Sequence, residues 1–204
     1  MAITRLNNNS ITSITALPSA AKLDTNDVVL LKTVTVSSSV SSVEFKNGVD
    51  DVVFDSTYKV YKIFGSNVDC TTSGDEIIAQ ISNDTGSTYK TSGYRGQALN
   101  YYWNGSAAGN AQHTFTNGIE VCRNVDSATT ETAYFELTIN EPNVSNLQTL
   151  YSQASHRDFQ TTANTYLYIS SCFYNDANIV VDAIRIIASS GNIDGGVFKL
   201  YGYK

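Results

Sequence analysis

The sequence predicts an all-β chain, a two-sheet antiparallel sandwich of jelly-roll type preceded by an extended N-terminal arm. Three observations lead to this prediction. Only 16% of the 204 residues are charged, against about 25% in an ordinary soluble domain, and turn- and strand-favouring Ser, Thr and Asn take up much of the difference. Short apolar runs recur along the chain and are separated by Gly, Asn and Asp, which is typical of strands joined by turns. No repeat of about 20–50 residues is present, which argues against a solenoid or a propeller.

Residues 1–20 predict an arm rather than part of a core. Isolated aliphatic side chains alternate with polar ones, three asparagines at Asn7–Asn9 oppose a helix, and Pro18 ends the segment. Such a segment cannot bury enough apolar surface to offset its ordering entropy, so we expect it to be ordered only against another surface. We place the arm and its linker at 1–42 and the sandwich domain at 43–204. The docking residues expected in the arm are Ile3, Leu6, Ile11, Ile14 and Leu17.

The sandwich domain is expected to begin at Val43, where two-residue alternation starts. The clearest strand is Tyr134–Asn140, in which Phe135, Leu137 and Ile139 share one face. Two stretches could hold a helix, Val144–Tyr151 and, with a weaker pattern, Ala20–Leu30. The expected strands are Val43–Phe45, Val52–Phe54, Tyr58–Phe64, Glu76–Ser82, Tyr134–Asn140, Tyr166–Cys172, Ile179–Ile187 and Val197–Tyr203.

The segment Thr91–Gly118 fits no strand pattern and is expected to be a long surface loop, where function tends to lie. It is rich in Gly and contains the single Trp of the chain. Its aromatic cluster supplies the best candidate contact residues, which are Tyr101, Tyr102, Trp103 and Asn104. Aromatic rings stack on sugars, but they also dominate subunit interfaces, and the sequence favours packing or subunit contact over glycan binding.

Charge and cysteine usage exclude several classes of partner. The net charge is −6, the pI is about 4.8, and no basic stripe is available to neutralise phosphates, so we expect no nucleic-acid partner and no membrane partner. The N-terminus lacks the pattern of a signal peptide. Cys70, Cys122 and Cys172 are an odd number without close spacing, which predicts buried free thiols in a protein made in a reducing cytoplasm.

No motif indicates catalysis, a metal or a cofactor. The two histidines, His113 and His156, are accompanied by no zinc-ligand spacing, and no nucleophile elbow is present. Oxygen-rich stretches at Asn47–Asp55 and Gly191–Gly196 could in principle hold calcium, although their residues are ordinary turn formers. We therefore expect no enzyme, no metal site and no cofactor.

Both ends of the chain carry informative stretches. The opening MAITRLNNNSITSITALPSA resembles the start of many structural proteins of marine bacteriophages, cyanophages among them, in which a shared arm precedes different domains. The closing SSGNIDGGVFKLYGYK is similar to the final strand pair of phage jelly-roll modules, with Gly196, Leu200, Tyr201 and Gly202 at the motif positions. The stretch Ile81–Tyr94 is similar to an internal hairpin of those modules, whereas residues 95–165 have no counterpart.

The resemblance implies a non-enzymatic virion protein that is assembled in the host cytoplasm. Its arm would dock onto other tail or capsid proteins, and the protein would be a tail-fibre-type appendage or a capsid decoration subunit, forming a homotrimer. Two alternatives stay open. The chain could recognise a host-surface glycan through Thr91–Gly118, or it could be an enzyme that depolymerises that glycan.

Overall fold

The computed structural model describes residues 27–103, 107–127, 132–158, 164–176 and 179–204. This part of the chain contains twelve strands. They are β1 (Val28–Val36), β2 (Val43–Lys46), β3 (Val60–Cys70), β4 (Asp75–Ser82), β5 (Tyr94–Trp103), β6 (Ala108–Phe115), β7 (Ile119–Val125), β8 (Ala133–Asn140), β9 (Thr149–Asp158), β10 (Asn164–Tyr174), β11 (Ala183–Ala188) and β12 (Ile193–Tyr203).

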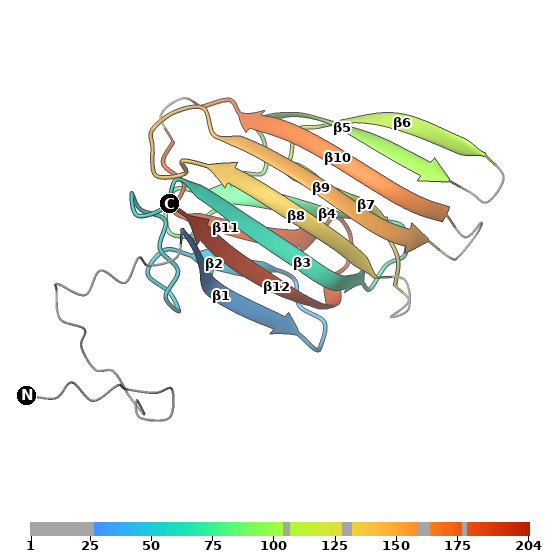
Figure 1. Ribbon diagram of the computed structural model, residues 1–204, viewed down its shortest axis with the longest axis horizontal. Coiled ribbons are helices and arrows are strands. Elements are labelled where there is room, and N and C mark those ends of the chain that lie inside the picture. The colour runs from blue at the N-terminus through green and yellow to red at the C-terminus, as the bar shows by residue number, and fades with distance from the viewer. Residues whose placement is uncertain (1–26, 104–106, 128–131, 159–163, 177–178) are drawn as a thin grey trace, which may run out of the picture.

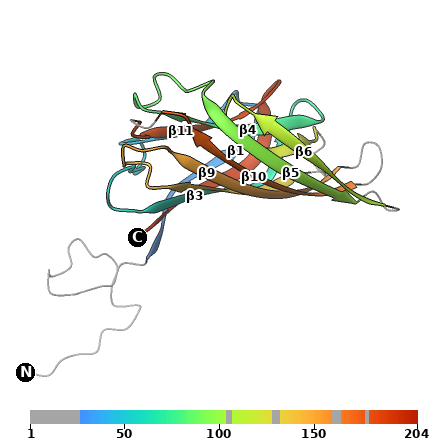
Figure 2. The same cartoon turned by 90° about the horizontal axis from the view of Figure 1, so that it is seen from above.

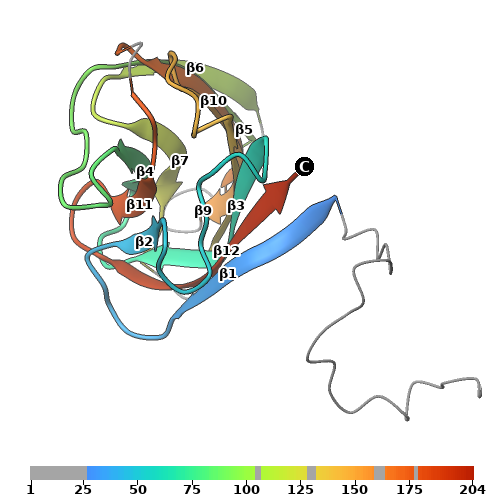
Figure 3. The ribbon, with the colours of Figure 1, turned by 90° about the vertical axis from the view of Figure 1, so that its left-hand side faces the viewer.

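The strands form two antiparallel sheets (Figure 1). The larger sheet has the order β1-β12-β3-β8-β9-β10-β5-β6, and the smaller sheet has the order β2-β11-β4-β7. Figures 2 and 3 show the smaller sheet lying against one face of the larger one. The expected all-β sandwich is confirmed.

The pairing of the strands is nested along the chain. The pair β4–β7 lies within β3–β8, which lies within β2–β11, which in turn lies within β1–β12. Two hairpins, β5–β6 and β9–β10, are inserted into this framework. Because β9 pairs with β8 and β10 pairs with β5, the two hairpins extend the larger sheet by four strands beyond β8 (Figure 1).

The core lies between the sheets and follows the two-residue period of the strands. Phe135, Leu137 and Ile139 of β8 are fully buried, as their alternation predicted. Phe198 and Leu200 of β12 are buried on the same side. All three cysteines are buried and unpaired, as expected.

The residues just before the expected domain boundary belong to the larger sheet. Residues 28–36, which were expected to belong to the arm and linker, form β1 and pair with β12. Val40 continues this association, because its backbone N–H donates to the carbonyl of Ile193 at 2.9 Å. The proposed docking residues lie outside the described residues; they are Ile3, Leu6, Ile11, Ile14 and Leu17.

The prediction of a long surface loop at Thr91–Gly118 is wrong. Most of this segment is the hairpin β5–β6, which pairs without a register shift along its length. The strand pattern is hidden because inward positions of β5 are occupied by Gly96 and Ala98 rather than by large apolar residues. The ring of Phe115 on β6 takes the place that a side chain at Gly96 would fill.

Neither expected helix is present in the described residues, and no helix there could span a membrane. Val144–Tyr151 is a turn followed by the start of β9, and the described end of Ala20–Leu30 belongs to β1. Val52–Phe54 is not a strand, although both Val52 and Phe54 are buried. The turn at Asn47 folds this segment back, because the backbone N–H of Phe54 donates to Oδ1 of Asn47 at 2.9 Å.

Candidate functional site

The aromatic residues that the sequence singled out lie at the end of β5. Tyr101 and Trp103 point away from the smaller sheet and are 44% and 53% exposed. Tyr102 alternates with them and is half-buried, with its ring 6.2 Å from the ring of Tyr166. Asn104 lies outside the described residues. The described members of the expected cluster are therefore divided between the two faces of the sheet, and Tyr101 and Trp103 share the outward face.

Exposed apolar side chains from neighbouring strands line up on this outward face. The register pairs Tyr134 of β8 with Ser155 of β9, and Ser155 with Leu167 of β10. Leu167 is paired in turn with Tyr101 of β5. Neighbouring strands lie about 4.8 Å apart, so these residues form one row across the sheet. Tyr134 and Leu167 are each 47% exposed and Tyr101 is 44% exposed, so the row is a partly exposed stripe of apolar side chains that Ser155 interrupts.

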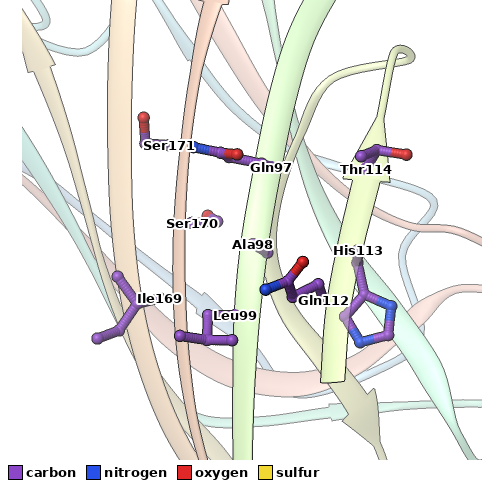
Figure 4. A pocket seen from close by; sticks show the side chains of 9 residues that line it. All are labelled: Gln97, Ala98, Leu99, Gln112, His113, Thr114, Ile169, Ser170 and Ser171. Carbon is purple, nitrogen blue, oxygen red and sulfur yellow. The ribbon is translucent and has the colours of Figure 1, made fainter. Parts of the chain in front are cut away.

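Two further rows of outward side chains, next to the stripe, line a hollow of about 360 Å³ over β10, β5 and β6 (Figure 4). One row consists of Ser171, Gln97 and Thr114, and the other of Ile169, Leu99 and Gln112. A second hollow of about 520 Å³ shares the first row and continues along the strands toward Arg95, Phe173 and Thr149. Together the two hollows form an open trough along β5, which we call the outward trough.

The lining of the outward trough is polar but almost without charge. Gln97, Gln112, Thr114 and Ser171 are exposed, and their side chains form no hydrogen bond with another described residue. Among the described residues that line the two hollows, Arg95 at one end is the only one with a permanent charge. The trough can therefore offer amide and hydroxyl donors and acceptors to a ligand.

A buried histidine–thiol pair joins the two sheets, with His156 on β9 and Cys122 on β7. His156 stacks on the ring of Tyr166, with centroids 4.7 Å apart and an angle of 6° between the rings. Nδ1 of His156 lies 3.5 Å from Sγ of Cys122. Burial raises the pKa of the Cys122 thiol, so the thiol stays protonated at neutral pH. A buried neutral thiol is a poor nucleophile, and we interpret this pair as part of the packing of the core.

Glu120 is a buried acid close to this pair, and its negative charge is balanced by Arg123. Oε1 of Glu120 accepts a hydrogen bond from Nη1 of Arg123 at 2.9 Å, and Nη2 of Arg123 lies 3.0 Å from Oε1 of Glu76. Ion pairing and hydrogen bonding of this kind are what allow charges to be tolerated in an interior. The three side chains are best explained as a structural network.

The structure describes both oxygen-rich stretches in full. Among the described residues, no group of three or more His, Cys, Asp or Glu side chains is placed to hold a metal ion. In Asn47–Asp55, the carboxylate of Asp50 is paired with Lys32 at 3.0 Å. The stretch Gly191–Gly196 forms the start of β12 and the turn before it.

Comparison of the chain with protein-family models, with curated proteins and with solved structures found no match.

Sequence reasoning did not identify the residues of the outward trough. Gln97, Gln112 and Thr114 lie in the segment that was interpreted as a loop, and Ser171 lies on the outward face of a strand whose neighbours were unknown. A signal was available in β5, where the polar Arg95 and Gln97 alternate with small residues. This alternation does not show that β10 lies next to β5, because the residue pattern of one strand does not specify which strands pair with it.

Proposed function

We propose that this chain is a non-enzymatic structural protein of a bacteriophage virion, displayed on the particle surface as a tail-fibre-type appendage or a capsid decoration subunit. It docks through its N-terminal arm onto other tail or capsid proteins, and it acts as a homotrimer. The observation that carries the proposal is the combination of the arm and the closing motif with a nested β-sandwich.

The strand order supports the jelly-roll interpretation of the sandwich. A jelly roll arises when a long antiparallel hairpin folds over so that nested strand pairs divide between two sheets. Here β1–β12 and β3–β8 fall in one sheet, and β2–β11 and β4–β7 fall in the other. Jelly rolls are frequent in viral capsid and lectin domains. A fold alone implies no function, so this agreement adds to the resemblance and does not replace it.

The residues of the closing motif have packing roles, as expected for a motif that specifies a module. Leu200 is fully buried in the core. Gly202 faces the ring of Tyr58, which leaves no space for a side chain. Gly196 has φ +133°, a conformation that other residues rarely adopt. The motif therefore describes how β12 fits between its neighbours.

The positions of the two edge strands of the larger sheet are compatible with a protein that is attached at one end and displayed at the other. The segment that follows the arm enters the sheet as β1 at one edge, while the hairpin β5–β6 forms the other edge. A chain that is anchored on its N-terminal side would thus carry the inserted hairpins far from the attachment point. Loops and insertions carried on a rigid scaffold are where recognition usually evolves.

The location of the protein tests the proposal. Immunogold labelling or cryo-electron microscopy of intact particles should find the chain on the particle surface, and sedimentation of the purified protein should give the mass of a trimer. Particles that form normally and contain no copy of the chain would contradict the virion assignment.

A second function, recognition of a host-surface glycan, is favoured by one specific observation. The aromatic side chains of Tyr101 and Trp103 are exposed on the outward face beside the outward trough. Aromatic rings and amide side chains are the groups that commonly contact sugars, through the C–H faces and the hydroxyls respectively. Binding of glycans by the purified protein, on an array of host-type glycans, would support this function without any reference to the particle.

A further inference from the structure

The outward trough combines three properties that together define a ligand class. It is hollow, it presents hydrogen-bonding groups that have no partner among the described residues, and it has an apolar floor. The hollow over β10, β5 and β6 has a volume of about 360 Å³, within the usual range for small-molecule sites. The adjoining hollow prolongs it along the strands.

The polar groups are arranged in rows with apolar groups between them. Ser171, Gln97 and Thr114 are cross-strand neighbours and form one row. In the next row, Ile169 and Leu99 are half-buried and provide an apolar floor, with Gln112 at the edge of the sheet. Each amide offers donors and an acceptor, and each hydroxyl offers both. This pattern matches a molecule that has hydroxyl groups around its rim and C–H groups on its faces.

An aromatic ring lies just beyond one end of the trough, in the next row of outward side chains. Tyr101 follows Leu99 on the same face of β5, and its 44% exposure leaves ring surface for contact. On β5 the lining of the trough runs from Arg95 to Leu99, a distance of about 14 Å, because a strand rises about 3.4 Å per residue. The trough is therefore extended, and it suits a chain of several rings better than a single small molecule.

The charge of the lining argues against an acidic ligand. Between Arg95 and Tyr101, the described residues that line the trough include no Lys, Arg, Asp or Glu. The net charge of the whole chain is −6, so its long-range field repels anions. A polyanion would have to bind without the cations that normally neutralise it.

We propose that the outward trough binds a neutral oligosaccharide, with Gln97, Gln112, Thr114 and Ser171 as hydrogen-bond partners of its hydroxyls and Leu99 and Ile169 beneath its C–H face. Tyr101 stacks against a terminal sugar. This inference rests on the second function proposed above, and it specifies both the site and the class of glycan.

The first test measures binding by the purified full-length chain. The probes are an array of neutral oligosaccharides built from glucose, mannose, galactose and N-acetylhexosamines, with hexagalacturonate as the acidic comparator; the hits are followed by titration calorimetry. We expect at least one neutral probe to bind, and hexagalacturonate to bind more weakly or not at all. Absence of binding by every neutral probe, or tighter binding of the acidic one, overturns the inference.

The second test locates the site with matched variants. Gln97→Ala should weaken binding of the neutral probe about tenfold, because an amide that bonds a ligand is lost, and Thr114→Ala should weaken it severalfold. The controls are Asn83→Ala, an exposed amide in the turn that follows β4 of the smaller sheet, and Thr33→Ala, an exposed threonine on the other edge strand of the larger sheet. Both controls should bind as the unaltered chain does. Unchanged binding by Gln97→Ala and Thr114→Ala overturns the assignment of the trough.

A third measurement separates a sugar from a second copy of the chain as the occupant. All four variants alter exposed side chains, so their unfolding curves should match that of the unaltered protein. Gln97→Ala should also sediment like the unaltered protein, and a shift to a smaller species would show that the trough is a subunit contact instead. The localisation experiments on intact particles are independent of the binding experiments. The chain could bind a sugar and still be missing from the virion, or it could be part of the virion and bind no sugar.

Discussion

Phe115 of β6 covers Gly96, its cross-strand partner on β5, so closely that a methyl group at position 96 would overlap the ring. The same relationship recurs between Phe135 and Gly65 of β8 and β3, and between Tyr102 and Gly109 of β5 and β6. In each pair an aromatic ring fills the space that the glycine leaves. This arrangement protects a glycine in a strand, which would otherwise weaken the sheet.

Gly96→Ala should therefore destabilise the protein, although alanine is normally the better strand residue. The added methyl group must displace the ring of Phe115, and overpacking of this kind costs about 1–3 kcal/mol. Urea denaturation followed by circular dichroism would measure the change in the free energy of unfolding.

The matched variants are Phe115→Ala and the double variant Gly96→Ala/Phe115→Ala. Removal of the ring also removes the clash, so the double variant should be no less stable than Phe115→Ala alone. Additive effects of the two substitutions would show that the ring and the glycine are not coupled.

Leu200→Ala should cost about 2–5 kcal/mol of stability, the usual range for truncating a buried leucine. Leu200 has no exposed surface and lies on β12 between β1 and β3. Thr35→Ala on β1 is the control, since its side chain is exposed and surface substitutions usually change stability by less than about 0.5 kcal/mol. Equal unfolding curves for the two variants would contradict the register of β12.

Asp84 should titrate at unusually low pH. Hydrogen bonds from the side chain of Thr88, the hydroxyl of Ser82 and the backbone of Thr88 lower its pKa to about 2, from an ordinary value of 3.8. A lowered pKa in the folded state means that the ionised carboxylate contributes stability above pH 3.8, and that this contribution is lost as the pH falls through about 2.

Thr88→Val removes the hydroxyl donor and should move the pKa of Asp84 upward, toward its ordinary value. NMR titration of the side-chain carboxyl carbon would measure it directly. Ser87→Ala, in the same turn, should leave the titration unchanged. A pKa that stays near 2 in Thr88→Val would assign the effect to the other donors.

Trp103→Ala should reduce adsorption of particles to host cells while leaving the fold and the oligomer intact. The side chain is 53% exposed at the end of the outward face, so little packing is lost, and exposed apolar patches mark contact sites. Adsorption counts, thermal melting and sedimentation velocity measure the three properties. Normal adsorption combined with a smaller sedimenting species would show that Trp103 holds subunits together.

Deletion of residues 1–20 should abolish incorporation into particles without changing the melting temperature of the sandwich. The first described strand begins at Val28, so the deletion ends before the sheet. Complementation of a gene-deleted phage, with a blot of purified particles, would measure incorporation. Normal incorporation of the shortened chain would rule out the arm as the docking element.

The fold class was predictable because it depends on local patterns. The alternation of Phe135, Leu137 and Ile139 specifies one buried face, and Asn-Gly and Gly-rich stretches mark the turns. Strands without large inward residues were missed, as in β5, where Gly96 depends on a ring from another strand. Alternation on one strand gives no information about such a partner.

The candidate site was predictable only in part. Tyr101 and Trp103 can be picked out from the sequence alone, because clustered aromatic residues are common at contact surfaces. Gln97 and Ser171 are common polar residues, and they become candidate site residues only because the sheet makes them cross-strand neighbours. They are more than 70 positions apart in the sequence (171 − 97 = 74), and no local pattern relates them.

The position of β12 between β1 and β3 has a consequence for synthesis of the chain. While the ribosome is still making the residues before Ile193, β1 and β3 have no strand to join them, and their backbone groups face an open gap. The larger sheet can close only after Tyr203 has left the exit tunnel, so completion of the fold follows translation of the whole domain. A chain that terminates early retains two unpaired edges and is a substrate for aggregation or proteolysis.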